Sequence, residues 1–361
     1  MNHAGPIRLG LLGFVFWALT MAAFDQPSAL AGKARLEPVP FEDLAGWSQD
    51  DHGLAFATFL RSCKALEANA AELRPAQKPG FDLTAICRAA SSANISSRAE
   101  ARRFFETRFQ PMRVVPAAGE GFLTGYYEPE FRGSRRPDAT YRVPLLDRPD
   151  DLVTVPQGEK LPGLDPVLQA GRRGAKGYEP YPDRAAIEDG ALGGRAKPVV
   201  YLREPGEAFI IHVQGSARIR LQDGSVMRVA YAGRNGHPYT SIGKLLVQRG
   251  EMDLETMTLA RLMGWLRDNP EPAKALMRQN RSYIFFREAN ELAQAEGPIG
   301  GAGIPRSEPL RRLMVAQDTG SAIVGPARGD FFAGTGPEAG TQAGLMRHKV
   351  AFVVLQPKAR P

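Results

Sequence analysis

Apolar residues recur at intervals of three and four positions in several parts of the chain, a spacing that predicts helices with one buried face. The clearest example is the set Phe56, Phe59, Leu60, Cys63 and Leu66. Helices are predicted at Ala55–Leu73, Leu83–Ala90, Ser97–Phe109, Ser241–Gly250, Leu254–Asn269 and Pro272–Gln279. Residues 32–50 are interpreted as a proline-rich linker that precedes the first helix.

From Val114 to Met227 the pattern changes to short runs rich in Val, Ile, Tyr and Phe, broken by Gly and Pro, which is typical of strands. Strands are predicted at Gly121–Tyr127, Pro198–Leu202, Ala208–His212, Arg218–Leu221, Met227–Tyr231, Tyr283–Arg287, Leu310–Gln317 and Lys349–Gln356. The run Gln222–Ser225 predicts a hairpin turn between two of them. The combination of elements predicts a mainly β protein with helices, of the α+β class.

Length and composition narrow the class of protein. A chain of 361 residues suggests about two domains. Its 43% hydrophobic and 24% charged residues exclude a wholly disordered or collagen-like chain. The formal net charge of +7 favours an anionic partner. Charge alone does not choose between nucleic acid, phospholipid and an acidic polymer.

The N-terminus has the pattern of a secretory signal peptide. Arg8 precedes the uncharged run Leu9–Ala23, and small residues at Ala29 and Ala31 fit a cleavage after Ala31. An uncleaved membrane anchor is the alternative. No cysteine lies near the cleavage position, so a lipid anchor is not expected. An exported basic protein is not expected to bind nucleic acid, which favours a cell-wall polymer or a membrane surface as the partner.

The chain has two cysteines, Cys63 and Cys87, each within a predicted helix. In an exported protein this pair predicts a disulfide that joins the two helices. Closing a loop of roughly 25 residues would stabilise the fold by about 3 kcal/mol. Two buried free thiols are the alternative.

Two aspartates, Asp318 and Asp330, lie in the glycine-rich segment Ala316–Gly340. Asp330 stands between a glycine and two phenylalanines, and aromatic neighbours that exclude water would raise the pKa of its carboxyl. Such a carboxyl can donate a proton near neutral pH. Gly334 is one of the glycines that would let the backbone approach a polymer closely. The alternative is that both aspartates only cap turns.

Two further polar clusters suit a saccharide. Alternation along a strand would place His212, Gln214 and Ser216 on one face, where they could bind sugar hydroxyls. The spacing of His212 and Ser216 does not fit a nucleophile elbow. In the second cluster, Thr124, Tyr126, Tyr127 and Glu128 set aromatic rings beside a carboxylate. A half-exposed strand and core tyrosines are the respective alternatives.

No metal or other cofactor is expected. The histidines are His3, His52, His212, His237 and His348, none at ligand spacing, and the chain has no cysteine cluster.

Together these motifs resemble the MltA family of membrane-bound lytic murein transglycosylases, which carry a C-terminal 3D domain. The motifs that carry the resemblance are TGYYEPE (124–130), HVQGSARIRLQDG (212–224), YAGRNGHPYTSIGK (231–244), SYIFFRE (282–288) and AQDTGSAIVG with DFFAGTGPEAG (316–340). They occur in order over roughly residues 120–355.

The resemblance implies cleavage of the β-1,4 bond between N-acetylmuramic acid and N-acetylglucosamine in peptidoglycan, with 1,6-anhydromuramyl ends as the product. It implies a double-psi β-barrel domain built from both ends of the chain, an inserted β-barrel-like domain, and a glycan groove between them. Asp330 would act as acid and then as base, and Asp318 would support it. Thr124, Tyr126, Tyr127, Glu128, Gln214, Ser216 and Gly334 would bind substrate.

The corresponding domain boundaries are residues 1–31 for the signal peptide, 32–127 for the linker and N-terminal helical part, 128–262 for the insert and 263–361 for the C-terminal part. The expected compartment is the periplasm. Glycan strands are the implied partner, whereas nucleic acid is not. Peripheral outer-membrane association and complexes with cell-wall synthases or hydrolases stay open.

The chain departs from the family pattern after Pro305. Family members continue there for about thirty residues, which include the first of three aspartates, whereas here Arg306–Glu308 leads directly to Pro309. A non-catalytic peptidoglycan-binding protein on the same scaffold is therefore the main alternative. A hydrolytic glycosidase and a membrane-surface binder are weaker ones.

Overall fold

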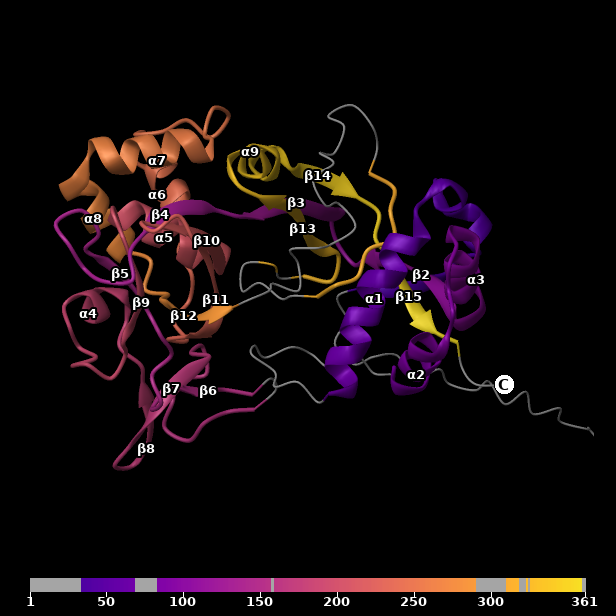
Figure 1. Cartoon of the computed structure of the whole chain (residues 1–361), viewed down its shortest axis with the longest axis horizontal. Coiled ribbons are helices and arrows are strands. Elements are labelled where there is room, and N and C mark those ends of the chain that lie inside the picture. Colours follow the sequence, from indigo (N-terminus) through magenta and orange to yellow (C-terminus); the bar gives the residue numbers. More distant parts are fainter. Residues whose placement is uncertain are drawn as a thin grey trace, which may run out of the picture.

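The computed structural model describes residues 34–68, 83–156, 159–289, 310–317, 323 and 325–358. Within these ranges helices and short strands alternate in a mixed arrangement, which confirms the predicted α+β class (Figure 1). The signal peptide, Asp318 and the departure after Pro305 lie outside the described residues.

The N-terminal helices are α1 (His52–Glu67), α2 (Thr84–Ser92) and α3 (Arg98–Arg108). Each agrees with a predicted helix, although α1 ends at Glu67 rather than at Leu73. Ser97 and Glu100 form a capping box at the start of α3, which satisfies backbone N–H groups that a helix leaves free. Edge-to-face contacts among the buried rings of Phe56, Phe59, Phe104, Phe105 and Phe109 hold α1 against α3.

The linker interpretation of residues 32–50 is wrong for the part that the structure describes. Residues 34–38 form strand β1 (Ala34–Pro38), and 3-10 turns follow at Phe41–Asp43 and Trp47–Gln49. The Trp47 ring is buried against Phe41 and His52. This tertiary contact and the pairing of β1 with β2 order a segment whose composition resembles a linker.

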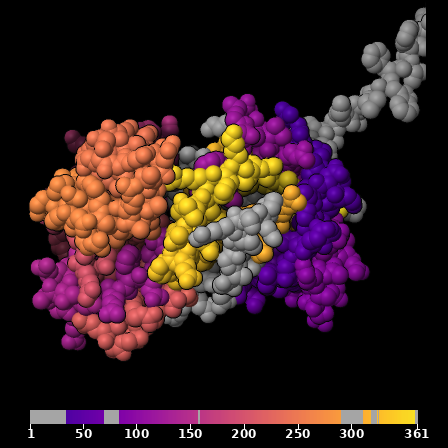
Figure 2. Space-filling model, turned by 90° about the horizontal axis from the view of Figure 1, so that it is seen from above, coloured from indigo at the N-terminus to yellow at the C-terminus, as the bar shows by residue number. Residues whose placement is uncertain are grey.

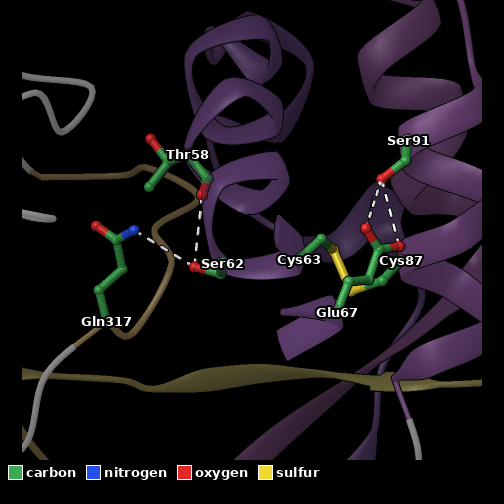
Figure 3. Close-up of a disulfide and its surroundings, with 7 residues drawn as sticks. All are labelled: Thr58, Ser62, Cys63, Glu67, Cys87, Ser91 and Gln317. Carbon is green, nitrogen blue, oxygen red and sulfur yellow. Dashed lines mark hydrogen bonds between the residues drawn. A yellow bond between two sulfur atoms is a disulfide. The ribbon is translucent and has the colours of Figure 1, made fainter. Parts of the chain in front are cut away.

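A disulfide joins Cys63 of α1 to Cys87 of α2, which confirms the predicted bridge (Figure 3). Both cysteines are fully buried in the phenylalanine core. Close to it, the Gln317 amide donates a hydrogen bond of 3.3 Å to Ser62 Oγ on α1. The bridge therefore lies near the contact between residues 310–317 and helix α1.

Two small sheets combine strands from both ends of the chain. In the first, β2 (Phe109–Pro116) lies between β1 and β15 (Val353–Pro357). In the second, β3 (Gly121–Glu128) lies between β13 (Arg328–Thr335), which runs parallel to it, and the antiparallel strand β14 (Arg347–Val350). Figure 2 shows the C-terminal segment, in yellow, between the insert and the N-terminal helices.

Two predicted C-terminal strands differ in the structure. The segment Lys349–Gln356 is not one strand, because β14 ends at Val350 and β15 begins at Val353 in another sheet. Residues 310–317 are not a strand. A strand needs a neighbour for its backbone groups, and here the Leu313 N–H instead donates to the Asp50 carboxylate at 2.6 Å.

Residues 130–289, called the insert from here on, contain a four-stranded sheet in the order β12–β11–β10–β4. Its strands are β4 (Glu130–Gly133), β10 (Ser216–Leu221), β11 (Val226–Arg234) and β12 (Ile284–Ala289). The antiparallel pairing of β10 with β11 confirms the hairpin at Gln222–Ser225. Smaller elements are β5 (Val143–Leu146), β6 (Val153–Thr154), β7 (Ala170–Gly174), β8 (Gly177–Pro180), α4 (Arg184–Glu188) and β9 (Pro198–Leu202).

The predicted strand Ala208–His212 is wrong, because these residues belong to helix α5 (Pro205–Gln214). Pro205 in the first turn, a capping box of Glu204 with Glu207, and Gly215 at φ +81° mark its ends. The apolar run inside it packs on both sides, since Ile211 contacts the β-sheet core and Ile210 the helical core. A helix buried all round carries the continuous apolar run that we interpreted as a strand.

Three more helices complete the insert on the side of α5: α6 (Ile242–Gln248), α7 (Leu259–Asp268) and α8 (Pro270–Arg278). Thr258 caps α7, which therefore begins at Leu259 rather than at the predicted Leu254. The expected boundary after residue 262 falls inside α7, and β12 beyond it pairs with β11. No helix of the described residues is both long and apolar enough to cross a membrane.

Removing the disulfide with a Cys63→Ala, Cys87→Ala double variant should lower the free energy of unfolding by about 3 kcal/mol, because the unfolded chain regains the freedom of a 24-residue loop. Urea unfolding followed by circular dichroism measures the loss. Reduction of the wild type with dithiothreitol should give a similar loss and should leave the double variant unchanged. Equal stability of the variant and the oxidised wild type would contradict this expectation.

Candidate functional site

The candidate site lies on one face of the sheet β13–β3–β14. Asp330 of β13 lies opposite Thr124 of β3, and Phe332 lies opposite Tyr126. Residues directly opposite on neighbouring strands point to the same side of a sheet. These four side chains therefore share a face.

Helix α9 (Pro337–Leu345) covers the other face. It approaches so closely that a Cβ on Gly125 would lie 2.8 Å from the Ala343 Cα, and one on Gly340 would lie 2.8 Å from the Tyr127 ring. Phe331 also points to this covered face, where it packs with Leu123 and Met346.

Thr124 connects two charged groups at the centre of the site. Its hydroxyl donates to Asp330 Oδ1 at 2.5 Å and accepts from Arg328 Nη2 at 2.9 Å. The Arg328 guanidinium also lies over the Phe122 ring, 5.3 Å from its centre. A hydroxyl has one proton, so a donor on one side of Thr124 orients that proton toward the carboxylate on the other.

Within the glycine-rich segment, Asp330 is a residue of strand β13 and does not cap a turn, which was the alternative for this aspartate. Of the two phenylalanines beside it in sequence, Phe332 shares its face and Phe331 does not. The Phe332 ring packs against Tyr126 with centres 5.2 Å apart. Both rings are partly exposed.

A β-bulge in β13 changes the register with β3, and so the direction of the side chains, at the end of this face. The register with β3 shifts between Phe332 and Thr335, and Gly334 there has φ +115°, a conformation that glycine adopts without strain. The shift sets Thr335 opposite Glu128, and its hydroxyl donates to Glu128 Oε2 at 2.7 Å. Gly334 thus shapes the backbone, a role that residue type alone did not reveal.

Glu128 is completely buried. Burial raises the pKa of its carboxyl, while the Thr335 hydrogen bond and the nearby guanidiniums of Arg228 and Arg218 act in the opposite direction. Arg228 Nε of strand β11 lies 3.5 Å from Oε1, an ion pair that joins the insert to the end of β3. Glu128 therefore connects two parts of the fold and has no surface for a ligand in this structure.

Tyr127 and Gln214 also hold the fold around the site. The Tyr127 ring is buried against α9, and burial raises the pKa of its hydroxyl to about 12. Its backbone N–H donates to the Gln214 Oε1 at 3.2 Å, so the end of α5 is tied to β3. Ser216, the first residue of β10, is half-buried and pairs with Ala230.

His212 is a core residue. It is buried in α5, stacks on Phe286, and its Nδ1 lies 3.0 Å from the buried Arg184 guanidinium. Burial and the Arg184 charge lower its pKa well below the ordinary value. The single polar face expected for His212, Gln214 and Ser216 is wrong, because the first two lie on a helix and the third on a strand.

In the part of the chain that the structure describes, no three His, Cys, Asp or Glu side chains gather where a metal could bind.

Comparisons with known proteins identify the family. The sequence profile of the MltA specific insert domain matches residues 122–287, and that of the 3D domain matches residues 291–356. A membrane-bound lytic murein transglycosylase from Agrobacterium tumefaciens, known from its crystal structure, is 35% identical to this chain in sequence. The two structures match with a TM-score of 0.76 over 89% of this chain and 97% of that one. The chain belongs to the MltA family of lytic murein transglycosylases.

Other MltA relatives agree. The crystal structure of MltA from Neisseria gonorrhoeae is 31% identical, with a TM-score of 0.71 over 91% of this chain and 96% of that one. The membrane-bound lytic murein transglycosylase A of Vibrio cholerae is 28% identical over 64% of both chains. That of Escherichia coli K12 is 34% identical over 51% of this chain and 61% of its own. The matches thus span less than two thirds of these two relatives.

Of the residues predicted for an MltA site, the structure brings Asp330, Thr124 and Tyr126 together. Sequence reasoning missed Arg328, although its position two residues before Asp330 places both on one face of a strand. Tyr127 and Glu128 are instead buried. The Gln214 amide oxygen accepts a hydrogen bond from the Tyr127 backbone N–H. Ser216 lies at the start of β10, where it pairs with Ala230. Asp318 lies outside the described residues.

Replacing the buried carboxyl in Glu128→Gln should change how stability depends on pH. Its raised pKa means that the folded protein holds the proton more tightly than the unfolded chain. This stabilisation is fully present below pH 4.5, the ordinary value, and is lost as the pH rises through the folded-state pKa. In urea unfolding, the free energy of unfolding of the wild type minus that of the variant should therefore be larger at pH 4 than at pH 7. An identical difference at both pH values would contradict a raised pKa.

Proposed function

We propose that this chain is a lytic transglycosylase that cleaves the β-1,4 bond between N-acetylmuramic acid and N-acetylglucosamine and leaves a 1,6-anhydromuramyl end. The observation that carries the proposal is the carboxyl of Asp330, oriented by the Thr124 hydroxyl on the sheet face that α9 leaves uncovered. Membership of the MltA family supplies the reaction class.

In this reaction Asp330 begins protonated and donates its proton to the glycosidic oxygen as the bond from that oxygen to the muramyl C1 breaks. The muramyl C6 hydroxyl then attacks C1, and its proton passes to the Asp330 carboxylate. The new bond joins O6 to C1, and no water is consumed. Because the nucleophile belongs to the substrate, one carboxyl suffices, unlike the paired carboxyls of glycoside hydrolases.

The neighbours of Asp330 support a saccharide ligand. The partly exposed rings of Tyr126 and Phe332 offer an apolar surface next to the carboxyl, on which a sugar ring can pack. Arg328 orients Thr124 and thereby the reacting carboxyl. In a solved structure that shares this fold at 24% identity and a TM-score of 0.56, MltA of E. coli holds chitohexaose.

The proposed setting is the periplasm, with glycan strands of peptidoglycan as the partner. The curated relatives are named membrane-bound, which supports peripheral association with a membrane. The basic net charge of +7 is suited to an anionic cell-wall polymer.

Asp330→Asn should reduce turnover of peptidoglycan by at least about 100-fold, because an amide cannot carry the transferred proton. Stability should change little, since the amide oxygen still accepts from Thr124. Digestion of purified peptidoglycan followed by mass spectrometry measures both rate and product. The wild type should release muropeptides lighter by one water than hydrolytic products.

Three other outcomes of that digestion would contradict the proposed activity or the role of Asp330. Products with reducing ends would identify a hydrolase. No product from a folded wild type that still sediments with peptidoglycan would identify a binding protein. Full activity of Asp330→Asn would remove this carboxyl from the mechanism.

Thr124→Val should lower kcat by about 10- to 100-fold and change KM little, because it removes a hydrogen bond to a charged group without removing that group. Thr124→Ser keeps the hydroxyl and should retain most of the activity. Steady-state kinetics on soluble glycan strands separates kcat from KM. Equal losses in the Val and Ser variants would show that packing of the threonine methyl matters instead of its hydroxyl.

A further inference from the structure

Strand β14 adds positive charge to the site face. Arg347 of β14 lies directly opposite Thr124, and Lys349 lies opposite Phe122, in antiparallel register. Opposed residues point to the same side, so Arg347 and Lys349 project from the face that carries Asp330 and Arg328. His348 between them points to the other side.

Arg347 differs from the other cations of this face. Lys349 pairs with Glu120 at 2.5 Å, and Arg328 is held by Thr124 and by backbone carbonyls. The Arg347 side chain is exposed, and among the described residues no carboxylate lies within ion-pair distance of it. Among the described residues around Thr124, two guanidiniums thus face one carboxyl, so the described side chains there carry an excess of positive charge.

Strand spacing sets the position of this charge. Asp330 and Arg347 lie on the two strands that flank β3, about 10 Å apart between backbones. An arginine side chain spans a large part of such a distance. A group bound by Arg347 would therefore sit beside the sugar at Asp330, on the opposite side of Thr124 from that carboxyl.

We propose that Arg347 binds a carboxylate of the peptide stem that the muramyl sugar carries. This inference rests on the proposed function, because it deepens the description of the same substrate. A muramyl sugar bears its acidic peptide as a side branch, so its carboxylates lie beside the glycan chain. Arginine suits this ligand since its planar guanidinium can form two parallel hydrogen bonds with one carboxylate.

Arg347 is thus a specificity residue. It distinguishes stem-bearing glycan from glycan without stems, and it does so by charge. Because the site is exposed, the preference should weaken as salt rises and the screening length falls below about 10 Å.

Binding to defined tetrasaccharides tests the proposal. All proteins carry Asp330→Asn so that the ligand stays intact, and isothermal titration calorimetry measures Kd. One ligand carries peptide stems, and the other is the same tetrasaccharide after an amidase has removed them. Arg347→Gln should weaken binding of the stem-bearing ligand about tenfold and of the stripped ligand less than twofold. Arg347→Lys should restore part of the loss.

The matched control is His348→Gln, an exposed residue on the same strand that points to the other side. It should bind both ligands as the parent protein does. Equal weakening of both ligands by Arg347→Gln, or no weakening of either, would overturn the proposal. A failure of the proposed function is separate, because it appears as absent anhydro products in the digestion with the wild type, whatever the binding result.

Discussion

The parallel pairing of β13 with β3 is the constraint on which the candidate site depends. It sets Asp330 next to Thr124, two residues 206 positions apart in the chain. Neither strand provides the site by itself, since one carries the carboxyl and the other carries the hydroxyl that orients it. The close approach of α9 to Gly125 fixes which face of the sheet is covered. Asp330 and Thr124 therefore lie on the opposite face.

Glu128 extends this arrangement to the insert. It accepts a hydrogen bond from Thr335 of β13 and forms an ion pair with Arg228 of β11 in the insert sheet. A buried carboxylate is costly unless it is paired, so the three elements must meet in one geometry for its charge to be accommodated. The strands β3 and β4, which follow each other directly, carry this connection between the two parts of the molecule (Figure 1).

The role of a residue followed from its surroundings more than from its type. Tyr127 and Glu128 stand beside Thr124 and Tyr126 in one motif, yet they are buried whereas the other two are partly exposed. The fold thus divides a single run of polar and aromatic residues into two partly exposed positions and two buried ones. His212 is a further example, since its contacts with Arg184 and Phe286 place it in the core of the insert.

The sequence by itself determined the α+β class, the disulfide, most helices and the hairpin at Gln222–Ser225, and it pointed to Asp330 as a candidate residue. It could do so because periodicity, turn residues and motifs are local features of short segments. Only the tertiary structure decided that Ala208–His212 is helical, that residues 34–38 are a strand, and that Arg328 and Arg347 flank Thr124. These features depend on packing and register between distant segments. A local pattern does not contain that information, since a buried helix and a buried strand show the same apolar run.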